Sequence, residues 1–101
     1  MGSRDELYEI LHGLLPYVHV YLQPPTRLVY PCLLVKKSTY DTNYSNDEIY
    51  KKLTLYTLTL IGMDADDAET YSEALLTLRY CSHERQYIAD NLYHDVFDLY
   101  F

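Results

Sequence analysis

The sequence lacks tryptophan and has only three glycines and two cysteines. It also has no long run of apolar residues. The scattered glycines Gly2, Gly13 and Gly62 form neither a phosphate-binding loop nor a nucleophile elbow. Cys32 and Cys81 make neither a metal site nor the disulfide framework of a small secreted protein, and we expect reduced core thiols. No stretch approaches the ~20 apolar residues of a membrane span. These absences argue against enzymes built on those motifs and against a helical membrane protein.

Basic residues are also scarce, since eight Lys and Arg stand against fifteen Asp and Glu, which gives a formal net charge of −7. Such a chain repels polyphosphates, so sequence-independent DNA binding is not expected. A surface that lies next to DNA without binding it would also be acidic. No signal peptide opens the chain, and we expect a soluble protein of the cytoplasm.

The histidines fall on four separate predicted segments: His12, His19, His83 and His94. None of their spacings sets two metal ligands on one face of an element. His94 precedes Asp95, but neighbouring residues of a strand point to opposite faces, so the two are not expected to form a catalytic dyad. We therefore predict no catalytic residue, no metal ligand and no cofactor, in a protein that is not an enzyme.

Tyrosine is abundant, with 13 among the 101 residues. Its side chain combines a large apolar body with a hydroxyl that needs a partner, which suits half-buried sheets and also protein interfaces. The length is enough for one small domain with one core and too short for two. We therefore predict a single domain over residues 1–101.

The segment 53–61 is predicted to be the central strand, because it is rich in β-branched, aromatic and leucine residues and lacks proline and glycine. Alternation along the strand places Tyr56, Leu58 and Leu60 on one face and leucine, threonine and isoleucine on the other. Neither face is fully polar. We expect a helix to cover one face, and we hypothesise that a partner subunit covers the other.

The first predicted helix begins at a capping box, in which the side chains of Ser3 and Glu6 each satisfy a backbone N–H group. Pro16 disfavours helical geometry at the residue before it and so ends the helix. One apolar stripe runs along the helix: Leu7, Ile10, Leu11, Leu14 and Leu15. We expect this stripe to pack on the sheet.

A second amphipathic helix is predicted over residues 65–80, with Asp66 at the N-cap and Glu69 three residues later. Acidic side chains near a helix start also suit its positive end. A calcium loop is the alternative for the acidic run at positions 64–69, but that pattern requires glycine where Glu69 stands and glutamate where Leu75 stands. Helix capping is therefore the better explanation.

The remaining predicted strands come from alternation and composition, and they cover residues 17–22, 28–37, 84–89 and 93–101. Asp90 and Asn91 form the predicted turn between the last two strands. Pro31 confines its segment to a sheet edge or a bulge. The sequence thus predicts an α+β fold, with a mixed, mostly antiparallel sheet of about four to five strands and two amphipathic helices packed on it.

Residues 38–50 are polar and rich in Asn, Asp and Ser, which favour turns. The connection exceeds the ~12 residues beyond which loops are usually functional or disordered. Tyrosines interleaved with acids favour a protein-contact loop, and a solvated hairpin tip is the alternative. The candidate interface residues are Tyr40, Asp41, Tyr44, Asp47, Glu48 and Tyr50.

Several segments occur in a characteristic order: the short N-terminal helix, Tyr-Val-His-Val-Tyr-Leu at 17–22, Tyr-Pro-Cys-Leu-Leu-Val at 30–35, the polar loop, the strand at 56–61 and one further helix. The closing residues 90–97, Asp-Asn-Leu-Tyr-His-Asp-Val-Phe, look like those of phage or prophage tail-completion proteins. In this order the chain resembles the small tail terminator proteins of long-tailed bacteriophages. The resemblance covers nearly the whole chain.

The resemblance implies an α+β domain that assembles as a hexameric ring. Such a ring caps the tail tube, made of the major tail tube protein, and offers a docking surface for the DNA-filled head and its head-completion or neck protein. DNA would pass through the ring without specific binding, and no membrane is involved. The implied location is the tail or neck of the virion, assembled in the cytoplasm of the host bacterium. The family offers no invariant functional residue to carry over.

Two functions of other kinds remain open. A head-completion or neck connector of the same particle would share the small α+β build and the acidity, and only its partner ring would differ. A small regulatory binding module would instead present Tyr40, Tyr44 and Tyr50 to a single protein partner.

Overall fold

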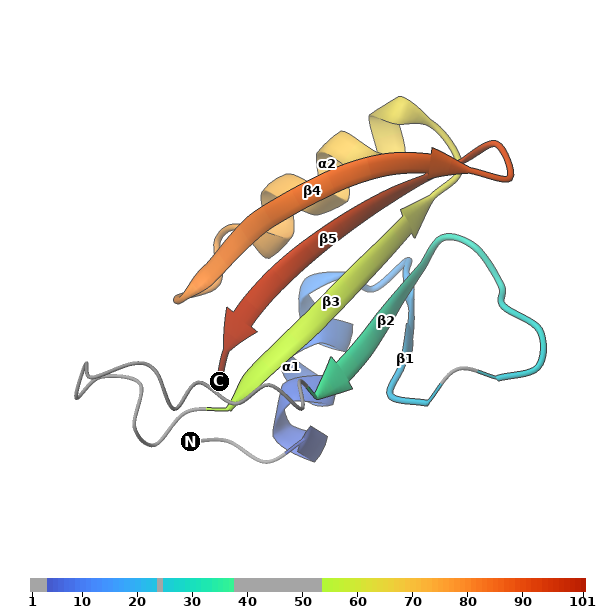
Figure 1. Ribbon diagram of the computed structural model, residues 1–101. Coiled ribbons are helices and arrows are strands. Elements are labelled where there is room, and N and C mark those ends of the chain that lie inside the picture. Colours follow the sequence, from blue (N-terminus) through green and yellow to red (C-terminus); the bar gives the residue numbers. More distant parts are fainter. Residues whose placement is uncertain (1–3, 24, 38–53) are drawn as a thin grey trace.

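Five strands of the described chain form one sheet in the order β1-β2-β3-β5-β4, with both helices on one of its faces (Figure 1). The computed structural model describes residues 4–23, 25–37 and 54–101. The elements are α1 (Arg4–Leu14), β1 (His19–Tyr21), β2 (Cys32–Lys37), β3 (Leu55–Gly62), α2 (Ala65–Leu75), β4 (Cys81–Ala89) and β5 (Leu92–Tyr100). β1 and β2 are parallel, and the other neighbouring pairs are antiparallel. The predicted α+β fold is therefore confirmed.

The predicted central strand is β3, which lies in the middle of the sheet. Its register pairs Leu58 with Val35 of β2 and with Phe97 of β5, and all three side chains are buried in the core. The strand runs one residue beyond the prediction, through Gly62. A side chain at this position would meet α2, because the backbone nitrogen of Ala68 lies 3.2 Å from the place of a Cβ.

α1 buries most of its apolar stripe, with Leu7, Leu11 and Leu15 almost completely inaccessible to solvent. Ile10 was expected on the same stripe, but 42% of it is exposed. It lies at the flank of the stripe, beside a small apolar cleft that Leu78 also lines. The predicted capping residue Ser3 lies outside the described residues.

α2 begins at a different cap from the one predicted. The N-cap is Asp64, whose Oδ1 accepts a hydrogen bond at 2.8 Å from the backbone N–H of Asp67. The prediction of Asp66 was wrong, because Asp64 presents the same acidic spacing two residues earlier and already has extended backbone geometry. On the inward side of α2, Ala68 and Leu75 are buried.

α2 also ends earlier than residue 80, at Leu75. The Thr77 hydroxyl donates a hydrogen bond at 2.6 Å to the carbonyl oxygen of Ala74, and the Thr77 backbone N–H donates to the same oxygen. These bonds tighten the last turn and compete with further helix. The connection then ends at Tyr80, whose φ of 63° is left-handed, and β4 starts at Cys81.

The four strands other than β3 begin at residues that differ from the prediction, and β5 among them begins one residue early, at Leu92. β1 is shorter than segment 17–22, β2 starts at Cys32 directly after Pro31, and β4 starts three residues before position 84. The turn between β4 and β5 is confirmed. Asp90 and Asn91 have φ values of 53° and 61°, which are typical of a two-residue type I′ hairpin whose twist matches that of the strands.

Candidate interaction surfaces

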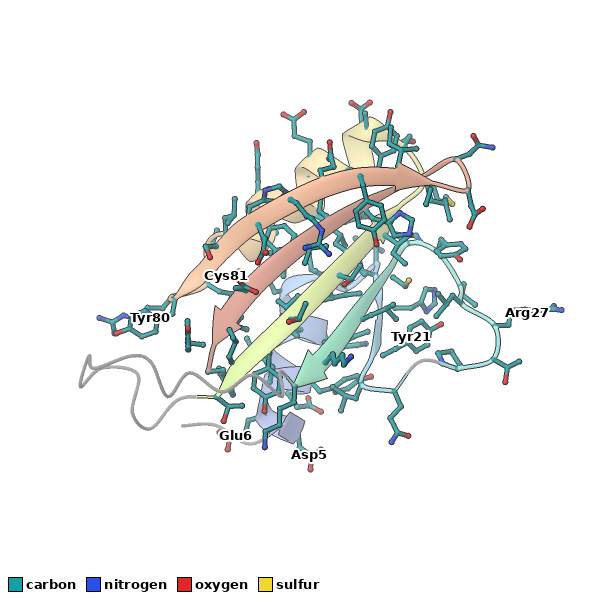
Figure 2. All side chains as sticks on the ribbon, in the orientation of Figure 1. Asp5, Glu6, Tyr21, Arg27, Tyr80 and Cys81 are labelled. Carbon is teal, nitrogen blue, oxygen red and sulfur yellow. The ribbon has the colours of Figure 1, made fainter. Side chains whose placement is uncertain are left out.

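The six residues predicted as a protein interface lie outside the described residues: Tyr40, Asp41, Tyr44, Asp47, Glu48 and Tyr50. Their role stays a prediction. The described part of the chain presents three other surfaces that bear on function. Two of them, the sheet face without helices and the edge strand β4, are visible in Figure 2. The third is a groove between α2 and β4.

The helix-free face of the sheet is formed by the side chains that alternate away from α1 and α2. The strand register aligns one polar row across it: Lys36, Thr57, Asp98 and Ser82. These four residues are half-buried or exposed, whereas Ile61 and Val96 on the same face are only 4% exposed. This polar row therefore lies in a part of the face that remains open to a partner.

β4 is the outer strand of the sheet, and residues 82–88 are exposed. A long exposed edge strand is a template for pairing with another chain. The register of β4 shifts at a bulge between His83 and Arg85. The charged side chains of Glu84 and Arg85 lie at this bulge, 3.7 Å apart. Charges and bulges of this kind limit indiscriminate pairing and leave room for a specific partner.

Glu84 also contacts Asp98 of β5. Partial burial of Asp98, together with the hydrogen bond and the negative charge of Glu84, raises the pKa of the Asp98 carboxyl from 3.8 to about 6, while Arg85 acts in the opposite direction. Two carboxyl groups in contact resist losing both protons. Asp98 of the polar row and Glu84 thus form a carboxyl pair that changes charge in mildly acidic solution.

Asp95 is the buried charged residue of the described core, with 2% of its surface exposed. Its Oδ1 lies 2.9 Å from Nε2 of His83 and accepts a hydrogen bond at 3.0 Å from Nε2 of Gln86. Its Oδ2 accepts a second bond from the same amide nitrogen at 3.2 Å. Burying a polar group costs free energy unless the group is hydrogen-bonded. The contacts with His83 and Gln86 of β4 therefore offset the cost of burying Asp95.

His94 does not join this cluster, as its place on the opposite face of β5 requires. Its ring instead stacks on Tyr87 with centroids 4.7 Å apart. His83 was not predicted to belong to a site, because the strand that became β4 was predicted to start one residue after it. The register of β4 and β5, which no spacing within the sequence encodes, places His83 on the same face of the sheet as Asp95.

A groove of about 400 Å³ lies between α2 and the strands β4 and β5. Its polar and apolar walls include Glu69, Glu73, Leu76, His83, Gln86 and Asp95. Glu69 and Glu73 stand one helical turn apart, and 46% of Leu76 is exposed. No Lys or Arg is among the lining residues, so the groove has a negative potential.

Ser72 lines the same groove, and its Oγ is buried without a hydrogen-bond partner among the described residues. A hydrolytic triad needs a base within hydrogen-bond reach of the nucleophile, and His83 makes no such bond to Ser72. Across the described ranges, no cluster of three His, Cys, Asp or Glu side chains is placed to hold a metal ion. The groove has the composition of a binding site for a polar group.

Both cysteines are free thiols with little nucleophilic character. Burial raises the pKa of the Cys32 thiol to about 11, and burial together with the nearby Asp98 carboxylate raises that of Cys81 to about 11. Only the thiolate attacks an electrophile, and it is scarce at neutral pH with such values. Packing in the sheet, and not thiol chemistry, therefore explains why cysteine stands at both positions.

In the ranges that the structure describes, no helix is long and apolar enough to cross a membrane. Comparison of the chain with known protein families, with curated proteins and with solved structures gives no match. The functional argument therefore rests on the fold, on these surfaces and on the pattern of the sequence.

Proposed function

We propose that this protein is a structural subunit of a bacteriophage virion, which caps the end of the tail tube as a ring and provides the docking surface for the DNA-filled head. One observation carries the proposal. Both helices cover one face of the sheet, while most of β4 is exposed and the polar row on the other face is exposed or half-buried. A closed ring requires two different surfaces on each subunit, because each subunit binds one neighbour through the first surface and the other neighbour through the second. The resemblance to tail terminator proteins supports the same function.

The charge of the chain fits this role. A net charge of −7 favours a channel along which DNA slides without sticking, since like charges repel. The proposed partners are further copies of the chain, six in the family that it resembles, together with the major tail tube protein and a head-completion or neck protein. The proposed site of action is the tail or neck of the virion.

The native mass of the purified protein, measured alone and with the tail tube protein, tests this function. We expect either a hexamer, or a monomer that becomes a ring on the end of the tube. Electron microscopy of tube ends would then show an added ring. A monomer that does not bind the tube protein would overturn the proposal.

A neck connector of the same particle is the second candidate, because it needs the same small acidic ring subunit. The two differ in the partner, which is the tube ring for a terminator and the portal-side ring for a connector. Binding to the portal-side ring with no binding to the tube would favour the connector. A regulatory module would remain monomeric with both.

A further inference from the structure

We propose that copies of this chain join through opposite sides of the sheet, with a basic edge of one copy docked into the groove between α2 and β4 of the next. The basic edge consists of Lys36 and Lys37 at the end of β2. This inference rests on the proposed ring and identifies the interface that would build it. The two surfaces differ, so the contact is heterologous and repeats around a ring.

The groove has the chemistry of a receptor for a lysine or arginine side chain. Glu69 and Glu73 flank it, and no Lys or Arg is among the lining side chains. The exposed part of Leu76 adds an apolar wall. A long basic side chain matches both features, because its methylene stem lies on apolar surface while its charged head meets carboxylates.

The basic edge lies across the sheet from this groove. β1 pairs only with the first three residues of β2, so Lys36 and Lys37 extend beyond it, and both are exposed. Within the described ranges of the chain, these two residues are the only lysines. β2 lies on the side of the sheet that Tyr21 of the neighbouring β1 marks in Figure 2. Cys81 of β4 marks the opposite side in that view.

The charge distribution along the chain explains why these two sides attract. The part from α2 to β5 holds most of the acidic residues, and its basic residues are Arg79 and Arg85. A subunit with an acidic side and a basic side aligns head to tail with its neighbour, and complementary potentials also fix the register of the contact. The exposed strand β4 borders the groove, so a docked copy would cover that edge as well.

Charge reversal on each side tests the interface. The first variant carries Glu69→Lys and Glu73→Lys, and the second carries Lys36→Glu and Lys37→Glu. We expect neither variant to assemble alone, under the conditions in which the wild type does, because each then presents two sides of like charge. An equal mixture should assemble, since the basic edge of the first meets the acidic groove of the second, and the reversed sides meet likewise.

A double variant with Asp5→Lys and Glu9→Lys is the matched control, because it makes the same change of charge at the same spacing on α1. It should assemble like the wild type. Circular dichroism and urea denaturation verify that every variant is folded. If both reversed variants assemble normally, or if the mixture of folded variants stays monomeric, this interface is wrong while the ring remains possible. A wild type that never assembles would instead refute the ring itself.

Discussion

Asp95 and His83 meet across β5 and β4, with 2.9 Å between Oδ1 and Nε2, although twelve residues separate them in the sequence. Because Asp95 is buried, its folded environment must replace the water that solvates it in the unfolded chain. We predict that Asp95→Ala lowers the free energy of unfolding by about 1–3 kcal/mol, the range for hydrogen bonds that involve a charged or buried group. Urea denaturation at neutral pH measures the change.

A double-mutant cycle separates this contact from general damage to the sheet. Combining Asp95→Ala with His83→Ala should give a coupling energy of about 0.5–2 kcal/mol, as for residues in one hydrogen-bond network. His94→Ala is the control, because His94 adjoins Asp95 in sequence but stacks on Tyr87 on the other face. Equal coupling of both histidines to Asp95 would contradict the assigned geometry.

Asp98 gives stability a pH dependence of unusual sign. Its pKa is raised from 3.8 to about 6 in the folded state, so between these values the folded chain binds the proton more tightly than the unfolded chain does. This contribution is present below about pH 4 and is lost as the pH rises to 6. We predict that Asp98→Asn removes the loss, so the variant gains in urea midpoint relative to the wild type as the pH rises through this window.

Glu84→Gln provides a second reading of the same pair. It removes the hydrogen-bonded charge that helps to raise the pKa of Asp98, and it should reduce the same pH-dependent loss. The useful quantity is the difference in urea midpoint between variant and wild type at each pH, because other groups titrate in all three proteins. A difference that does not change between pH 4 and pH 7 would refute the assignment.

The parts of the fold that depend on local pattern were predictable from the sequence. The stripe on α1, the alternation of β3 and the Asp90-Asn91 turn each follow from the periodicity or backbone preference of a few adjacent residues. The ends of α2 were not, because Asp64 and Asp66 offer the same local signal, and Thr77 stops the helix through its own side chain. Where several local solutions compete, tertiary contacts decide among them.

The candidate surfaces needed long-range information. That β4 is an outer strand depends on the strand order, and the contact between His83 and Asp95 depends on register and on the bulge that follows His83. No spacing within the sequence encodes either relationship. Similarly, Lys36 and Lys37 form part of an edge only because β1 ends opposite Leu34.

The thiols should react slowly in the folded protein. With a pKa of about 11, roughly 0.1% of the Cys81 thiol is ionised at pH 8, against roughly a quarter of an unperturbed thiol. We predict that iodoacetamide labels the folded protein at least ~100-fold more slowly than the urea-unfolded protein, as followed by mass spectrometry. Ser82→Cys is the control, since position 82 is exposed, and this new thiol should be labelled rapidly. Rapid labelling of the folded wild type would contradict the burial of Cys32 and the partial burial of Cys81.

The two faces of β3 should respond differently to truncation, although the sequence alone makes both look apolar. Leu58 is fully buried beneath the helices, while Thr59 is half-buried on the helix-free face. We predict that Leu58→Ala costs about 2–5 kcal/mol of unfolding free energy, because it removes packed methyl groups and leaves a cavity. Thr59→Ala should cost under about 1 kcal/mol, the scale of strand propensity. Urea denaturation compares them, and equal losses would mean that the second face is packed as tightly as the first within a single subunit.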